Sequence, residues 1–242
     1  MLELNGRKVL VLGLGDTGMS MARWLSARGA RVTVADTRAQ PPHAAALVRE
    51  LPAVAIECGA IADSSLRRTD LIAISPGIDR RIPAIADAIK RGTPVAGDVE
   101  LFAQALPQLK SKPRVIAITG TNGKSTVTQM AGEICAAAGR RTVVAGNIGT
   151  PVLEALDDVE RSGTAPDVFV LELSSFQLES TASLDADAAA MLNLSEDHLD
   201  RYDGIADYAR AKQRIFIGDG AQVLNRADAC SAGMAVAGRV VH

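Results

Sequence analysis

The 242-residue sequence predicts an α/β fold with two successive parallel-sheet domains. Short apolar segments rich in β-branched residues alternate with longer segments of helical periodicity. Strands of this kind are typical of parallel sheets, in which connecting helices cover both faces. Hydrophobic residues make up 48% of the chain and charged residues 22%, so the chain can bury a sizeable core.

The first domain is expected to consist of strands separated by helices. A helix over 17–28 places Met21, Trp24 and Leu25 on one face, and Gly29 follows as its C-cap. Pro83 begins another helix, because a missing N–H costs nothing in the first turn. The expected strands are 8–12, 31–35, 54–57 and 71–75.

A polar break at 110–113 predicts a linker, so we expect one domain over 1–112 and a second over 113–242. Arg239 begins a further strand that stops at His242, which indicates that the second domain is truncated; a short edge strand is the alternative. The second domain is expected to contain strands over 115–119, 141–145, 168–172 and 188–194, and helices over 124–138 and 205–217.

Composition excludes several classes of function. The net charge is −2 and aromatic residues make up 3%, which disfavours nucleic-acid binding. Cys58, Cys135 and Cys230 are far apart, which excludes a disulfide framework and a cysteine zinc site. The sequence shows no export signal and no apolar stretch of membrane-spanning length, so we expect a protein of the cytoplasm without membrane insertion. A monomer is a separate expectation.

The first chemical motif is the turn Gly13-Leu14-Gly15-Asp16-Thr17-Gly18, which follows the first strand and begins a helix. Asp36 ends the second strand, as in Rossmann-like nucleotide-binding domains. Two features disfavour NAD: Asp16 puts a carboxylate where a pyrophosphate would approach, and Thr37 and Arg38 follow Asp36. We therefore expect a nucleotide or diphosphate here, although a glycine turn made for packing alone is the alternative.

The second motif is a phosphate loop of the P-loop type after the strand over 115–119. Its backbone N–H groups would bind phosphate oxygens, Lys124 would neutralise their charge, and Ser125 could ligate Mg²⁺. It is a variant, because Ile118 stands where the full pattern has glycine. The residues expected to bind ATP are Gly120, Thr121, Asn122, Gly123, Lys124, Ser125 and Thr126.

Three further residues are candidates for the same sheet edge. Glu172 ends an apolar strand, where a carboxylate is well placed to bind Mg²⁺. His198 follows another apolar strand, and Lys212 lies on a later helix. Taken alone, Glu172 could equally be a solvent-exposed acid, a lone histidine is usually structural or solvated, and a lysine on such a helix is normally solvated.

These segments together resemble the Mur ligase family of peptidoglycan precursor synthesis. The loop GTNGKST, the strand end ELSSFQL, the segment NLSEDHLDRY and the helix YARAK occur in the family's order. The segments GLGDTG, DTR and SPGI are similar to those of members that add D-glutamate to UDP-N-acetylmuramoyl-L-alanine. The resemblance covers nearly the whole chain, but leaves no room for the family's third domain, so we expect a fragment that cannot complete ligation alone.

The resemblance implies an ATP-dependent amide ligase of cell-wall synthesis, and through it a role in cell shape and cell division. ATP would phosphorylate the terminal carboxylate of UDP-N-acetylmuramoyl-L-alanine, and D-glutamate would attack the acyl phosphate. The implied cofactors are two Mg²⁺ ions and a carbamylated Lys212. The amino acid added is inferred from the resemblance alone.

The resemblance also implies the role of each site residue. Lys124, His198 and Lys212 would be catalytic, and Ser125, Glu172, His198 and Lys212 would hold metal. The residues implied to bind the UDP substrate are Asp16, Thr17, Asp36, Thr37, Arg38, Gly77, Asn147 and Ser174.

Three alternatives remain open at this point. The chain could be another Mur ligase or a folylpolyglutamate synthetase, although the latter normally lacks such an N-terminal domain. It could be an NAD-dependent oxidoreductase built on the first glycine turn, which leaves the phosphate loop unexplained. It could also be a non-catalytic nucleotide-binding module.

Overall fold

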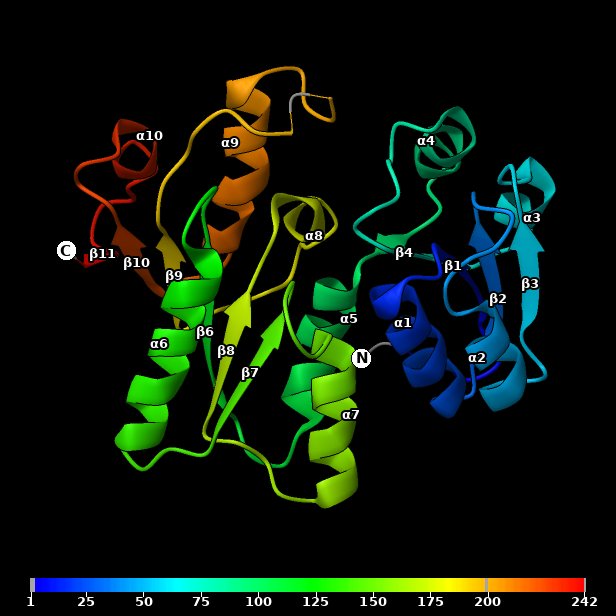
Figure 1. Ribbon diagram of the computed structural model, residues 1–242, viewed down its shortest axis with the longest axis horizontal. Coiled ribbons are helices and arrows are strands. Elements are labelled where there is room, and N and C mark those ends of the chain that lie inside the picture. The colour runs from blue at the N-terminus through cyan, green and yellow to red at the C-terminus, as the bar shows by residue number, and fades with distance from the viewer. Residues whose placement is uncertain (1–2, 199, 242) are drawn as a thin grey trace. The chain divides into compact units, whose positions relative to one another are not determined.

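The computed structural model describes residues 3–198 and 200–241, so Leu199 of the histidine segment and the terminal His242 lie outside the described residues. The chain divides into two compact units between Leu101 and Phe102 (Figure 1). This division comes earlier than the linker expected at 110–113. The helix α5 (Asp98–Ala105) crosses it, and Phe102, the first residue of the second unit, packs its ring edge-on against Phe169 of the same unit at 5.1 Å.

The first unit is built on a parallel sheet, as the sequence predicts. Its described strands have the order β3-β2-β1-β4-β5 (Figure 1). The four predicted strands are present with shifts of one residue at some ends, and the short β5 is added. The bounds are β1 Lys8–Leu12, β2 Arg31–Asp36, β3 Ala55–Cys58, β4 Leu71–Ile74, β5 Val95–Ala96, α1 Asp16–Ala27, α2 Ala44–Glu50, α3 Asp63–Arg67 and α4 Pro83–Lys90.

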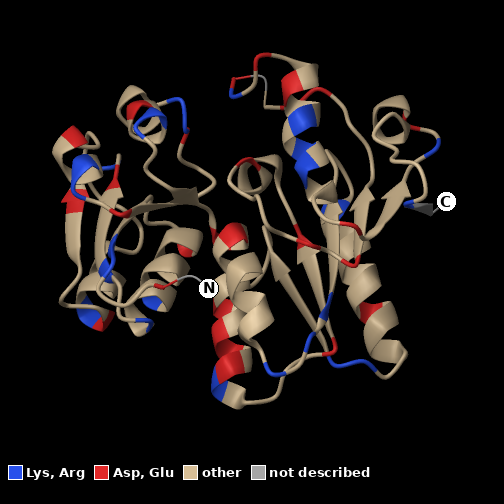
Figure 2. Cartoon of the chain, turned by 180° about the vertical axis from the view of Figure 1, so that it is seen from behind, with Lys and Arg blue, Asp and Glu red and all other residues tan. Residues whose placement is uncertain are grey.

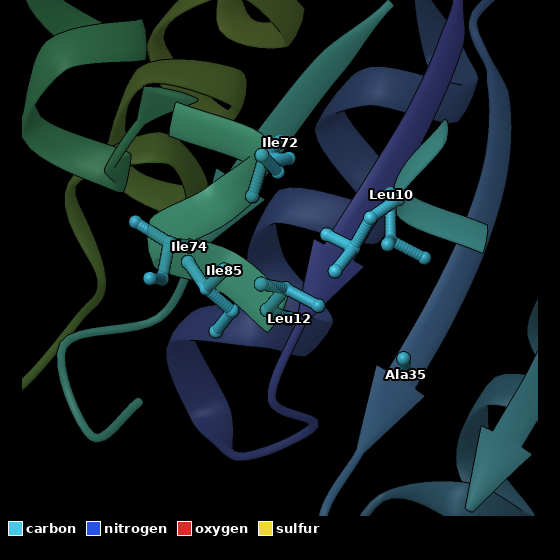
Figure 3. Packing of buried hydrophobic residues seen from close by; sticks show 8 residues of the cluster. Leu10, Leu12, Ala35, Ile72, Ile74 and Ile85 are labelled. Carbon is cyan, nitrogen blue, oxygen red and sulfur yellow. The ribbon is translucent and has the colours of Figure 1, made fainter. Parts of the chain in front are cut away.

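Both faces of the central strand β1 are buried. Leu10 and Leu12 point to the face that α3 and α4 cover, where they pack with Ile74 of β4 and Ile85 of α4 (Figure 3). Val9 and Val11 alternate with them and are also buried. Burial on both faces explains why this strand is a continuous apolar run.

The second unit contains a parallel sheet whose described strands have the order β11-β10-β9-β6-β8-β7 (Figure 1). The strand predicted over 188–194 ends at Met191, and the helix predicted over 205–217 ends at Gln213 before a 3₁₀ turn. The bounds are β6 Arg114–Thr119, β7 Thr142–Gly146, β8 Val168–Glu172, β9 Ala188–Met191, β10 Ala221–Leu224, β11 Val240–Val241, α6 Lys124–Ala137, α7 Val152–Ser162, α8 Ser175–Glu179, α9 Ile205–Gln213 and α10 Ala229–Ala232.

The strand order creates a switch point at β6. The chain passes from β6 to β7 and β8 on one side of it and later to β9 on the other. The segments that follow β6, β8 and β9 therefore lie together at the carboxyl edge of the sheet, where ligands bind in open α/β sheets. The order of the strands thus gathers the motif residues of this unit at one edge.

Charged residues lie mostly on the helices and in the loops, and the strands are largely uncharged (Figure 2). Among the described residues, no helix combines the length and the apolar character needed to cross a bilayer.

Candidate functional site

The glycine turn of the first unit can be made only with glycine at two of its positions. Gly13 has φ = 88°, a conformation that side chains disfavour. A Cβ on Gly18 would lie 1.8 Å from the carbonyl oxygen of Gly13, so α1 could not begin so close to β1 with any other residue there. The hydroxyl of Ser75 donates to the same Gly13 oxygen at 3.2 Å and brings the turn after β4 alongside.

Asp36 is a buried part of this turn. Its side chain is 0% exposed, and its two oxygens accept from the Leu14 N–H at 2.6 Å and from the Arg38 guanidinium at 2.6 and 2.8 Å. Bonding to Arg38, opposed by burial, lowers the pKa of Asp36 from 3.8 to about 2. The structure thus shows Asp36 holding the turn together, and direct contact with a ligand stays a prediction.

Replacing Asp36 by asparagine is expected to destabilise the chain by about 2 kcal/mol at pH 7. Because the folded pKa is the lower one, this stabilisation is present above the unfolded value of 3.8 and is lost as the pH falls to about 2. Urea unfolding at neutral and acidic pH measures it. The exposed Asp87→Asn variant is the control, and equal losses in the two variants would contradict the assignment.

The other residues predicted for the UDP substrate surround this turn. Asp16 is exposed and its carboxylate lies 2.7 Å from the imidazole of His43. Thr17 begins α1, and Gly77 is exposed in the turn that Ser75 ties to Gly13. All of them lie at the carboxyl edge of the first sheet, together with the exposed Thr37 and Arg38 after β2.

The phosphate loop connects β6 to α6, where the sequence predicts it. Gly123 has φ = 79° and directly precedes α6. The ammonium of Lys124 donates to the Thr121 carbonyl oxygen at 2.9 Å, so it lies across the loop. Ser125 and Thr126 are exposed in the first turn of α6. The loop therefore presents a lysine and two hydroxyl groups at a helix N-terminus.

The segment after β9 holds the loop in place, a role that the sequence interpretation missed. The Asn193 side chain accepts from the Asn122 N–H at 2.8 Å and donates to the Asn122 carbonyl oxygen at 3.0 Å. The Ser195 N–H donates to the Thr121 hydroxyl at 3.1 Å. The available signal was the polar Asn193, two residues after an apolar strand.

Glu172 ends β8 beside the phosphate loop. It pairs in register with Ile118 of β6, is 2% exposed, and accepts from the Asn147 side-chain amide at 3.0 Å. A Cβ on Gly146 would lie 2.1 Å from the Glu172 carbonyl oxygen, so glycine is required for Asn147 to reach this position. Asn147, which is also a predicted site residue, thus orients the buried carboxylate of Glu172.

Ser174 caps α8 in this structure. Its hydroxyl accepts from the Gln177 N–H at 3.2 Å, and the Gln177 side chain accepts from the Ser174 N–H at 3.1 Å. This reciprocal pair is a capping box, which fixes the start of α8 directly after Glu172. Its substrate contact stays a prediction.

Lys212 of α9 is buried, whereas a lysine at such a position is ordinarily solvated. Its side chain is 1% exposed and donates to the Gly120 carbonyl oxygen at 2.8 Å. Burial and the nearby charge of Lys124 lower the pKa of Lys212 from 10.5 to about 7. An amine that is partly neutral near pH 7 is therefore held against the phosphate loop.

His198 follows β9 and lies within an aromatic cluster. Its ring is 4.7 Å from that of Phe176 in α8 and 6.2 Å from that of Tyr208 in α9. Its backbone has φ = 53°, and its side chain is 44% exposed. Because β8 and β9 both flank β6 in parallel, His198 and Glu172 lie at the same edge of the sheet.

Among the described residues, no three side chains of histidine, cysteine, aspartate or glutamate are close enough to hold a metal ion together. What the structure does gather at the edge is a mixed set of oxygen and nitrogen groups. Lys212 contacts the loop at Gly120, Asn147 contacts Glu172, and the Tyr208 hydroxyl lies 3.4 Å from that of Thr121.

Comparisons with known proteins bear on the family of this chain. Residues 7–97 match the family model of the Mur ligase MurD-like N-terminal domain, and residues 118–239 match that of the Mur ligase middle domain. The chain is 56% identical to the UDP-N-acetylmuramoylalanine–D-glutamate ligase of Thiobacillus denitrificans, with 99% of this chain and 53% of the relative covered. The ligase of the same name from Methylobacillus flagellatus is also 56% identical, with 98% and 51% covered.

The chain also shares its fold with a ligase whose crystal structure is known. The UDP-N-acetylmuramate:L-alanyl-gamma-D-glutamyl-meso-diaminopimelate ligase of Neisseria meningitides superposes with a TM-score of 0.59 at 16% identity, over 95% of this chain and 74% of that one. The chain spans about half the length of the first two relatives. The middle-domain model alone accounts for about half of the chain, and the N-terminal model for most of the rest. The chain therefore belongs to the Mur ligase family.

Proposed function

We propose that this chain provides the UDP-substrate-binding and ATP-binding parts of a ligase that adds D-glutamate to UDP-N-acetylmuramoyl-L-alanine. Two relatives named UDP-N-acetylmuramoylalanine–D-glutamate ligase are 56% identical to this chain. The observation that carries the proposal is the meeting of the phosphate loop, the buried Glu172 and the buried Lys212 at one sheet edge. ATP and a UDP-linked precursor would be the substrates, so we place the reaction in the cytoplasm, and a monomer stays an expectation.

The first glycine turn would bind the UDP part of the substrate. Its open side offers the backbone at the N-terminus of α1, the hydroxyls of Thr17 and Thr37, and the Gly77 turn. Asp36 would act by keeping Arg38 and the Leu14 N–H in place, since both of its oxygens are already used. This engagement also disfavours the NAD alternative, in which the acidic residue would bind a ribose hydroxyl.

The second unit would bind ATP at the loop over 120–126. The Lys124 ammonium, which now donates to the Thr121 oxygen, would turn to the β- and γ-phosphates. The Asn193 side chain would fix the shape of the loop through the Asn122 backbone groups, and the N–H groups at the start of α6 would bind the phosphate oxygens. Asn147, exposed after β7, would contact the muramoyl part of the substrate, and Ser174 would help to position it.

The residues at the edge fit Mg²⁺ in part as they stand. The Ser125 hydroxyl and the Glu172 carboxylate are hard oxygen donors, and His198 offers an imidazole for a second ion. The ammonium of Lys212 does not fit beside a divalent cation, because the charges repel. When bound, Mg²⁺ would neutralise phosphate charge during transfer.

Carbamylation of Lys212 would remove this conflict. The neutral amine attacks CO₂, a C–N bond forms, and one proton is released, so the side chain becomes an anionic carbamate with two oxygen atoms. Burial favours the neutral amine that this reaction needs, and the Gly120 contact holds the nitrogen at the loop. The modified side chain would be a ligand of the same chemistry as Glu172.

The reaction would then proceed in two balanced steps. A carboxylate oxygen of the UDP substrate attacks the γ-phosphorus, the bond to the β-phosphate oxygen breaks, and an acyl phosphate and ADP result. The amine of D-glutamate attacks the acyl carbon, phosphate leaves, and the amide forms with release of a proton. The contribution of the described chain is to bring two anionic reactants together, with Lys124 and the loop amides offsetting their charge.

Binding measurements on the 242-residue chain test the assignment of the first unit. We expect UDP-N-acetylmuramoyl-L-alanine to bind in isothermal titration calorimetry, UDP to compete with it, and NADH to leave both unaffected. Tight NADH binding with no effect of UDP would show that the first glycine turn serves a dinucleotide instead.

A further inference from the structure

A polar cavity lies in the first unit, at the edge of the sheet opposite the glycine turn. It has a volume of about 400 Å³, and Lys8 and Arg31, the first residues of β1 and β2, lie at it. The glycine turn follows the last residue of β1, so the two places are at opposite ends of the same strands. The volume is in the range of small-molecule sites.

The cavity lies between the beginnings of two strands and the segment of α3. Leu10 and Thr33 are register partners on the face that α3 and α4 cover, and Leu10 belongs to the buried core there. The helix α3 has five residues and ends at Arg67, and Lys8 and Arg31 at the beginnings of β1 and β2 are exposed. Ser65 and Thr69 from the α3 segment also line the cavity.

Three cations line this cavity without an acidic partner. Lys8 and Arg31 are register neighbours in adjacent parallel strands, which places two like charges side by side. Arg68 approaches from the α3 segment, and its guanidinium donates to the Ser64 carbonyl oxygen at 3.0 Å. Among the described residues, no carboxylate forms an ion pair with any of the three side chains.

One carboxylate belongs to the cavity, and it is engaged elsewhere. Glu57 of β3 accepts from the Ser65 hydroxyl at 2.6 Å. Asp70 is nearby but binds backbone, since its side chain accepts from the Lys8 N–H at 2.9 Å. Three cations against one lining carboxylate leave a positive balance of two charges (three minus one) around hydroxyl groups of threonine and serine.

We propose that this cavity binds a small phosphate-bearing anion. A phosphate group would relieve the repulsion among Lys8, Arg31 and Arg68, and the hydroxyls of Thr33 and Thr69 would complete its hydrogen bonds. Glu57 would accept from a hydroxyl group on the ester part of such a ligand. The proposal rests on this cavity alone and is independent of the ligase assignment.

Amide NMR on the ¹⁵N-labelled 242-residue chain tests the proposal with orthophosphate, glycerol 3-phosphate and glycerol as probes. Both anions are expected to shift the amide signals of Lys8, Arg31 and Thr69 in a saturable way, with glycerol 3-phosphate the tighter, and glycerol is expected to shift none. Titration of the Lys124→Ala variant separates these shifts from binding at the phosphate loop. Shifts confined to 120–126 in the unaltered chain would overturn the proposal.

Variants that remove one positive charge provide a second test of anion binding at the cavity. Arg31→Gln and Arg68→Gln are each expected to weaken anion binding about tenfold, because each removes one charge-assisted contact. Arg49→Gln on α2 removes the same charge away from the cavity and is expected to change the affinity by less than about twofold. Equal weakening in all three variants would show general charge attraction, and no weakening in the first two would show that the anion binds elsewhere.

Discussion

The Lys124→Ala variant is expected to bind ATP roughly a hundredfold more weakly than the unaltered chain. The ammonium of Lys124 lies across the loop at 2.9 Å from the Thr121 oxygen, at the N-terminus of α6, where phosphate charge would collect. Losing a charged hydrogen bond together with its Coulomb attraction costs about 3 kcal/mol of binding free energy, which corresponds to a roughly hundredfold loss of affinity. Calorimetric titration with ATP and Mg²⁺ measures the change.

Lys112→Ala is the matched control, because Lys112 is an exposed lysine of the polar break before β6. It is expected to leave ATP affinity unchanged within about twofold. Unfolding curves of both variants establish that each is folded. If the two variants lose affinity equally, or if Lys124→Ala loses none, the loop over 120–126 does not bind ATP as proposed.

Carbamylation of Lys212 is expected to give a signal that is lost completely when this lysine is replaced. With ¹³C-labelled bicarbonate, the chain is expected to give a carbamate carbon signal that the Lys212→Met variant lacks entirely. The pKa of Lys212 is lowered to about 7, so the reactive neutral amine, and the signal with it, increases from about pH 6 to about pH 8. Methionine fills a similar volume without an amine, so the variant is expected to fold.

The Mg²⁺ dependence of ATP binding provides the second readout of that prediction. With the carbamate present, Mg²⁺ is expected to strengthen ATP binding at least about tenfold more in the unaltered chain than in Lys212→Met. A carbamate signal that persists in the variant would assign the modification to another amine. Equal Mg²⁺ effects in both proteins would remove Lys212 from the metal site.

The fold was largely predictable because its strands are simple apolar runs. The strands β1 and β8 begin and end where periodicity and flanking residues place them, at 8–12 and 168–172. The end of β9 at Met191 was not predictable from hydrophobicity, since Leu192 and Leu194 beyond it are as apolar as the strand. The polarity of Asn193 marks a change there, but its hydrogen bonds to the Asn122 backbone join residues far apart in the sequence and cannot be predicted from a local pattern.

The candidate site was predictable in its residue types but not in their environments. The glycines and Lys124 follow a strand and Glu172 ends one, and parallel strands bring their carboxyl ends to one edge. The burial of Lys212 depends on how α9 packs, and the engagement of Asp36 depends on the turn of the Arg38 side chain. The spacing of residues in the sequence predicts neither the burial of Lys212 nor the hydrogen bonds of Asp36. The first arises from contacts between distant residues, and the second depends on a side-chain rotamer.

A crystal structure of the 242-residue chain with Mg²⁺ and a non-hydrolysable ATP analogue would show whether the loop over 120–126 and Glu172 bind ATP and its metal ion. We expect the analogue's phosphates against the backbone of 120–126, with Mg²⁺ coordinated by the Ser125 hydroxyl and the Glu172 carboxylate. Phosphates bound away from this loop, or a metal ion that contacts neither side chain, would contradict this expectation.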